Sequence, residues 1–152
     1  MSGSQTFQRL TEETIEAHHQ IHFYLDQMAQ TLKGLREGLS DVEPMRRLAA
    51  QLQGFTERLV EHHQTEERDG LFHAILEALP SRRVEIDRLR HQHGKMLEIL
   101  EMARIHAQRG ESAEADGLRV DLEEFLERFR QHERDEEDLL RLALERDKAT
   151  QK

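Results

Sequence analysis

The sequence predicts an all-α protein, folded as an antiparallel up-down-up-down four-helix bundle. Apolar residues recur at helical spacing through four long blocks, and β-strand signals are absent. The 152 residues include only two prolines and eight glycines, most of which lie between the blocks. Long helices with short connections place neighbours antiparallel. A chain of this length is expected to form one domain, over residues 5–148.

The first two helices are expected to begin near Thr6 and near Asp41 or Pro44, since proline suits a first helical turn. The first should continue to Leu39. In the second, the apolar stripe changes phase at Gly70, which predicts a bulge or break there. The stripes contain Leu10, Thr14, His18, Ile21, Leu25, Met28, Leu32 and Leu35 in the first helix, and Leu48, Leu52, Phe55 and Leu59 in the second.

The third helix is expected after Pro80, with Ser81 as its N-cap, and should end at Gly110. The fourth occupies the C-terminal block. The third stripe contains Ile86, Leu89, His93, Met96, Leu100 and Ala103, and the fourth contains Leu118, Leu122, Phe125, Phe129, His132, Leu139 and Ala143. All four stripes would face a shared core.

A repeat relates the second and fourth helices. Residues 55–62 (FTERLVEH) and 125–132 (FLERFRQH) match at an offset of 70 residues, and a Glu-Glu pair follows each after three residues. Residues four apart share one helix face, so His132 and Glu136 should continue the apolar stripe into the core. The repeat places His62 and Glu66 likewise. Buried carboxylates need a partner, and no lysine or arginine lies beside them on the stripes, so a metal cation is the simplest one.

Histidines on the other two stripes complete a symmetric set of candidate metal ligands. The set is His18, His62, Glu66, His93, His132 and Glu136. Imidazole with carboxylate favours iron or manganese, and glutamates can bridge two ions ~3.5–4 Å apart. Three residues remain alternatives: His22, at the edge of its stripe, and His63 with Glu67, which repeat the spacing one step around the helix. His19 and His91 point away from their stripes and are expected at the surface.

This pattern resembles the hemerythrin-like HHE cation-binding domain. The segments that carry the resemblance are residues 62–67 (HHQTEE), 89–93 (LRHQH) and 132–140 (HERDEEDLL), and it covers nearly the whole chain. It implies an antiparallel bundle with a non-haem di-iron centre held by the six residues of the set, with manganese or zinc as alternative metals.

The chain departs from oxygen-carrying hemerythrins, whose third and fourth helices carry His-xxx-His and His-xxxx-Asp. Leu97 stands four residues after His93, and Glu136 or Glu137 follows His132. The departure argues against reversible oxygen carriage and predicts open coordination positions for peroxide, oxygen or nitric oxide. The expected function is binding or breakdown of these molecules, with catalase- or peroxidase-like turnover left open. Alternatives are an oxygen or nitric oxide carrier, a sensor, or an iron buffer.

Composition narrows the partners. A net charge of −9 disfavours nucleic acid, and no apolar run approaches the ~20 residues of a membrane span. The absence of cysteine excludes disulfides, iron–sulfur clusters and thiolate zinc sites. Together with an N-terminus unlike a signal peptide, it predicts a cytoplasmic location. A monomer or a homodimer is expected, the latter through an exposed edge at Leu71 and Phe72.

Overall fold

The computed structural model describes residues 3–36, 42–68, 70–109 and 115–149. Its elements are α1 (Gly3–Arg36), α2 (Val42–Arg68), α3 (Leu71–Ala78), the 3₁₀ turn η1 (Pro80–Arg82), α4 (Arg83–Arg109) and α5 (Ala115–Ala149). No strand occurs in these ranges, so the predicted all-α class is confirmed. None of the helices combines the length and the apolar character that crossing a membrane requires.

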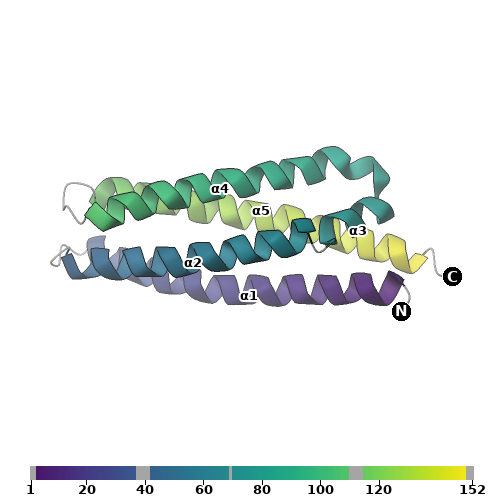
Figure 1. The fold of residues 1–152 in the computed structure, drawn as a ribbon, viewed down its shortest axis with the longest axis horizontal. Coiled ribbons are helices and arrows are strands. Elements are labelled where there is room, and N and C mark those ends of the chain that lie inside the picture. Colours follow the sequence, from purple (N-terminus) through teal and green to yellow (C-terminus); the bar gives the residue numbers. More distant parts are fainter. Residues whose placement is uncertain (1–2, 37–41, 69, 110–114, 150–152) are drawn as a thin grey trace.

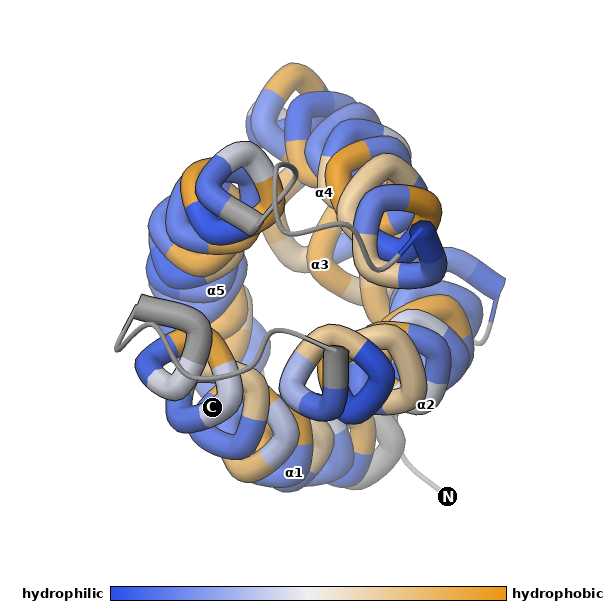
Figure 2. Tube along the Cα trace, turned by 90° about the vertical axis from the view of Figure 1, so that its left-hand side faces the viewer, coloured by the Kyte–Doolittle hydropathy of each residue, from blue (hydrophilic) through white to orange (hydrophobic). Residues whose placement is uncertain are grey.

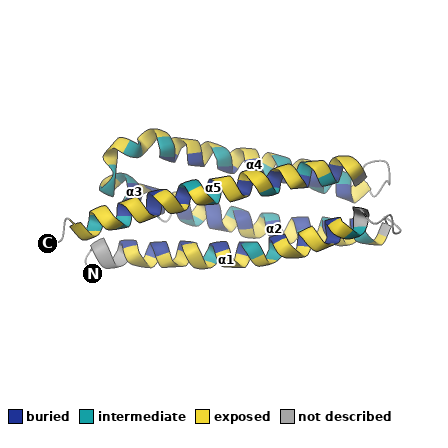
Figure 3. Cartoon of the chain, turned by 180° about the vertical axis from the view of Figure 1, so that it is seen from behind, coloured by how far each residue is buried: buried dark blue, intermediate teal, exposed yellow. Residues whose placement is uncertain are grey.

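The four long helices lie lengthwise beside one another (Figure 1). α1 and α4 each pack against both α2 and α5. A view along the long axis therefore shows a ring of helices around a common interior, with hydrophilic residues prevailing on the outside (Figure 2). The chain passes back and forth along this axis, so the start of α1 and the end of α5 lie at the same end of the molecule. Buried residues form a stripe along each helix (Figure 3).

The second predicted helix is divided at Gly70, as its change of phase indicated. α2 ends at Arg68 and α3 begins at Leu71. Between them Gly70 has a φ of 100°, in the left-handed region that favours glycine. Its carbonyl oxygen accepts a 2.8 Å hydrogen bond from the N–H of Ala74, so α3 starts directly after the turn. The change of direction buries Leu71 and Phe72 completely. The expectation that these two residues form an exposed dimer edge is therefore wrong.

The predicted N-cap at Ser81 is also wrong, because Ser81 lies inside η1 and α4 begins at Arg83. The connection is a series of turns, in which the N–H of Leu79 donates to Ile75 O (2.7 Å) and the N–H of Arg82 donates to Leu79 O (3.0 Å). The other boundaries are close to those expected, with Pro44 in the first turn of α2. Three predicted boundaries, at Leu39, Asp41 and Gly110, lie outside the described residues.

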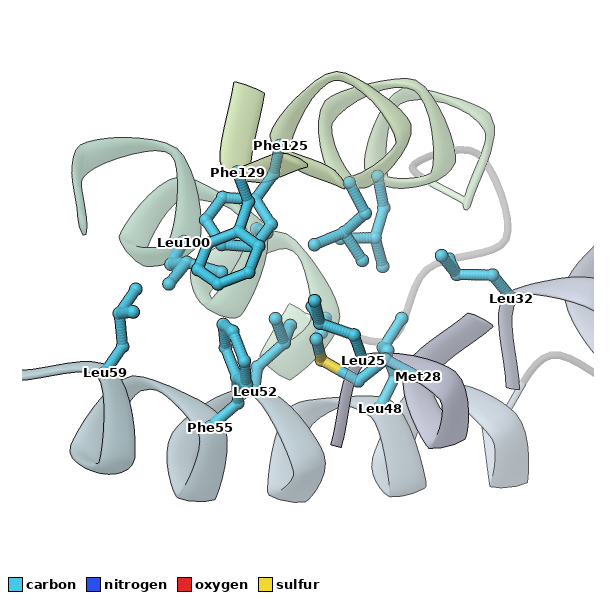
Figure 4. Close-up of a cluster of buried hydrophobic side chains, with 14 of the residues drawn as sticks. Leu25, Met28, Leu32, Leu48, Leu52, Phe55, Leu59, Leu100, Phe125 and Phe129 are labelled. Carbon is cyan, nitrogen blue, oxygen red and sulfur yellow. The ribbon is translucent and has the colours of Figure 1, made fainter. Parts of the chain in front are cut away.

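A polar layer separates two apolar clusters in the interior. The cluster in Figure 4 lies farther from the chain termini, and its Phe55 ring meets Phe125 edge to face, with 5.6 Å between centroids. The other cluster, nearer the termini, includes Phe72, Ile86 and Leu139. Each fully buried side chain of this size contributes about 1.5–3 kcal/mol to folding. The two clusters thus fix the four helices on both sides of the polar layer.

We expect Gly70→Ala to destabilise the fold, because an L side chain in the left-handed region costs roughly 1–2 kcal/mol. Gly54→Ala is the matched control. Gly54 is exposed within α2, an added Cβ meets no atom within 4 Å, and alanine should stabilise the helix by about 0.5–1 kcal/mol. Urea unfolding measures both changes. Equal effects of the two substitutions would contradict the role given to Gly70.

Candidate metal centre

The polar layer collects imidazole and carboxylate groups from all four long helices. They are His18 on α1, His62 and Glu66 on α2, His93 on α4, and His132 and Glu136 on α5. All six side chains are buried, and the two glutamates are 0% exposed. Each residue occupies the inner stripe of its helix; His132, for example, lies one turn from the core residue Phe129, so the apolar pattern of the helices also points these groups inward. The structure therefore brings together the six residues selected from the sequence.

Glu136 stands between two groups of histidines. One candidate metal-binding group consists of His18, His62 and Glu136, and another of His93, His132 and Glu136; in each group the ligand atoms lie within 4.8 Å of one another. Glu136 Oε1 lies 2.9 Å from His18 Nε2, whereas Oε2 lies 3.4 Å from His132 Nε2. The two oxygens of one carboxylate thus face different histidine groups, as a bridging ligand would.

Glu66 also lies between the two groups. Its Oε1 is 2.7 Å from His62 Nε2 and 3.8 Å from His93 Nε2. Within the described residues, however, neither oxygen of Glu66 makes a hydrogen bond of acceptable geometry, and the same is true of Glu136 Oε2 and His93 Nε2. Unsatisfied buried polar atoms cost about 1–3 kcal/mol each, and more when charged. Because these atoms are carboxylate oxygens and an imidazole nitrogen, the donor set fits a metal cation.

Burial prepares the histidines for ligation. It lowers the pKa of His62 to about 4 and, helped by His132, the pKa of His93 to about 3. Both rings are therefore neutral at pH 7, the form that binds metal. Burial and the charge of Glu136 raise the pKa of Glu66 well above its usual range. Burial acts in the same direction on Glu136, but contacts with Glu66, His132 and His18 outweigh it and hold the pKa of Glu136 well below the usual range.

His18 differs from the other histidines. Burial alone would lower its pKa, yet hydrogen bonds to Glu136 and Glu137, together with the charges of Glu136 and Glu133, raise the pKa to about 9. The metal-free centre thus contains an imidazolium beside the ionised Glu136. A cation that binds between them must displace the proton from His18 Nε2, so metal binding releases protons.

The two alternative residues on α2, His63 and Glu67, differ in burial. His63 is buried and its ring stacks on His93, with 3.6 Å between centroids, but it belongs to neither metal-binding group. Burial, then the proximity of His93, lowers the pKa of His63 to about 2. Glu67 is 37% exposed, and its Oε1 lies 3.5 Å from His93 Nδ1. His62 and Glu66, which the repeat selected, are both buried in the shared space, and so is His63, which the repeat did not select.

His22 lies at the outer edge of the centre. Its side chain is 41% exposed, and its Nε2 is 2.6 Å from Glu133 Oε1. Glu133 and Glu137 form a further group with the outward Nδ1 of His18. His19 and His91 are exposed, as expected.

Sequence reasoning did not predict two contacts to the outward nitrogens of the histidines, although it had named Glu137 as an alternative to Glu136. Gln92 Oε1 lies 2.7 Å from His132 Nδ1, and Glu137 Oε1 lies 3.1 Å from His18 Nδ1. Gln92 stands beside His93 in the sequence and Glu137 beside Glu136. Their off-stripe positions gave no sign of contact with a neighbouring helix.

A cavity of about 250 Å³ between α1 and α2 reaches the centre. Its lining includes Thr14, Ala17, Tyr24, Arg58 and His62. Arg58 lies over the ring of Tyr24, 5.3 Å from its centroid. A cavity of this size admits water-sized molecules to the edge of one histidine group.

The metal-free protein is expected to lose stability as the pH falls below 6.5. The folded-state pKa values of His62, His63 and His93, about 4, 2 and 3, lie below the ordinary histidine value of 6.5, so the unfolded chain binds more protons on acidification. Each such proton lowers the free energy of unfolding by about 1.4 kcal/mol per pH unit. Glu66, whose folded-state pKa is raised well above its usual range, opposes part of this loss. Because three histidines act against one carboxyl group, a net loss of stability on acidification follows.

Above pH 6.5 the sign reverses. His18 keeps its proton up to a pKa of about 9 in the folded state, so its contribution to stability is lost as the pH rises through that value. Urea unfolding of chelator-treated protein should therefore show maximal stability near pH 6.5, with lower values at pH 5 and pH 9. Constant stability between pH 5 and pH 6.5 would contradict the assignment of three buried neutral histidines.

Comparisons with known proteins agree with this geometry. The family model for the hemerythrin HHE cation binding domain matches residues 12–143, which include every member of both metal-binding groups. Neither the curated proteins nor the solved structures contain a match to the chain. Because the family model covers most of the sequence, the chain belongs to the hemerythrin HHE cation-binding family.

Proposed function

We propose that the protein is an antiparallel up-down-up-down four-helix bundle that holds a pair of non-haem iron ions and binds or breaks down oxygen-derived small molecules there. The observation that carries the proposal is the position of Glu136, whose two oxygens face two separate histidine groups. A carboxylate that bridges two ions ~3.5–4 Å apart needs this placement. Glu66, which lies between the same groups, would supply a second shared carboxylate.

The composition of the centre supports iron. Its donors are imidazole nitrogens and carboxylate oxygens, and the chain has no thiolate ligand to offer. This set suits non-haem iron and manganese, and it also tolerates zinc. A bound iron pair would supply redox chemistry and Lewis acidity toward peroxide, oxygen or nitric oxide.

The ligand set leaves room for such a molecule. Leu97, at the position where oxygen carriers have a second histidine on this helix, packs its partly buried side chain against the apolar cluster of Figure 4. It offers no donor atom, so the group with His93 and His132 has fewer protein ligands than a carrier would have. The cavity that ends at His62 gives small molecules a path from solvent. These two features favour a reactive centre over reversible oxygen carriage.

A carrier, a sensor or an iron buffer is the alternative function, since the same ligand geometry would bind small molecules without turnover. Iron-loaded protein is expected to evolve oxygen from hydrogen peroxide at a rate well above that of equimolar free iron, measured with an oxygen electrode. A rate no higher than free iron, combined with a reversible absorption change under oxygen or nitric oxide, would favour the carrier or sensor function instead.

Ligand variants test the assignment of the metal centre. We expect His62→Ala and His132→Ala to weaken iron binding by at least about 100-fold. Loss of a residue that only hydrogen-bonds to a ligand already weakens metal binding by up to about 100-fold, and these variants remove a proposed ligand itself. His19→Ala and His91→Ala are matched controls on the same helices as His18 and His93, because both side chains are exposed. Iron content after dialysis against a competing chelator measures the difference. Equal retention in all four variants would refute the assignment.

A further inference from the structure

Two ligand histidines contact chemically different partners on their outward sides. His18 Nδ1 lies 3.1 Å from Glu137 Oε1, and His132 Nδ1 lies 2.7 Å from Gln92 Oε1. An amide or carboxylate oxygen can only accept, so each ring donates its Nδ1–H outward and keeps Nε2 for the centre. The contacts join α1 to α5 and α4 to α5, so they hold the rings across helix interfaces. One ring is supported by a carboxylate and the other by a neutral amide.

The nature of the acceptor changes the imidazole that donates to it. A carboxylate draws the proton more strongly than an amide oxygen does, which makes the ring a more basic ligand. The His18 side is reinforced by Glu133, whose Oε2 lies 3.9 Å from Nδ1 and whose side chain is only 13% exposed. Glu137 is 47% exposed, so solvent screens part of its charge.

The contacts of the other ligand histidines do not cancel this difference between a carboxylate and an amide acceptor. Glu67 Oε1 lies 3.5 Å from His93 Nδ1, but that nitrogen makes no hydrogen bond within the described part of the chain. Glu136 faces both groups and therefore acts on both. The carboxylate-backed ring thus belongs to the group of His18 and His62, and the amide-backed ring to the group of His93 and His132.

We propose that Glu137 and Gln92 are positioning residues that make the two ion positions of the centre inequivalent. The ion beside His18 has the more basic ligand and is the more easily oxidised, whereas the ion beside His132 keeps the higher reduction potential. The proposal rests on the proposed metal pair. The ion beside His18 would be oxidised first. The ion beside His132, whose ring donates to Gln92, would be the stronger oxidant.

Isosteric substitutions exchange an amide acceptor for a carboxylate, or a carboxylate for an amide, and keep an acceptor in place. Gln92→Glu should lower the higher of the two reduction potentials, and Glu137→Gln should raise the lower one. Both variants therefore narrow the gap between the two one-electron steps, but from opposite directions. Potentiometric titration of iron-loaded protein with dithionite as the reductant measures both steps. Gln64→Glu, an exposed position on α2, is the control for added charge and should move neither step by a comparable amount.

Stepwise zinc affinity gives a second readout that does not depend on redox chemistry. Gln92→Leu, which removes the acceptor, should weaken one of two zinc-binding steps by about 10–100-fold and leave the other unchanged. Gln92→Glu should restore the affinity, which a loss of packing alone would not predict. If both binding or reduction steps shifted in the same direction, or if neither shifted more than in the Gln64→Glu control, this proposal would be overturned. The proposed function would still stand in that case, provided the protein bound two ions. Failure of the unaltered protein to hold two ions of any metal would overturn both.

Discussion

The complete burial of Glu136 is the constraint on which the rest of the structure depends. A carboxylate that is 0% exposed and ionised needs positive charge nearby, which the His18 imidazolium supplies. Histidines from three other helices converge on Glu136 or on its neighbour Glu66. These polar groups interrupt what would otherwise be one continuous apolar interior. The division of the core into two clusters is therefore a direct consequence of placing a charge in the interior between the helices.

The two clusters in turn hold the polar layer in place. Phe55, Phe125 and Phe129 pack on one side of it, and Phe72 with Ile86 on the other. Close-packed side chains of this kind resist displacement, so the histidine nitrogens and glutamate oxygens keep their separation without relying on loops. The left-handed turn at Gly70 makes this possible on α2, because it rotates the following helix until Phe72 faces inward and meets His93 at 5.6 Å.

The sequence predicted the features that depend on periodicity. Helical spacing and the 70-residue repeat identified the all-α class, the break at Gly70 and the six residues of the polar layer. What it missed depends on the rotation of one element against another. The burial of Leu71 follows from the turn at Gly70, and that of His63 accompanies its stacking on His93 of α4; the spacing of residues along a single helix specifies neither. The contact of Gln92 with His132 likewise depends on how α4 and α5 are rotated.

Protons and metal ions would compete for the same groups in the proposed centre. Contacts with Glu136 and Glu137 raise the pKa of His18 to about 9, so its ring is protonated at neutral pH in the metal-free fold, and burial shifts the pKa of Glu66 upward as well. The imidazolium of His18 balances the charge of Glu136 in the metal-free fold. A metal ion held in the proposed centre would have to displace that proton, so its binding would depend on pH, whereas His62 and His93 are already neutral, which is the form that binds metal.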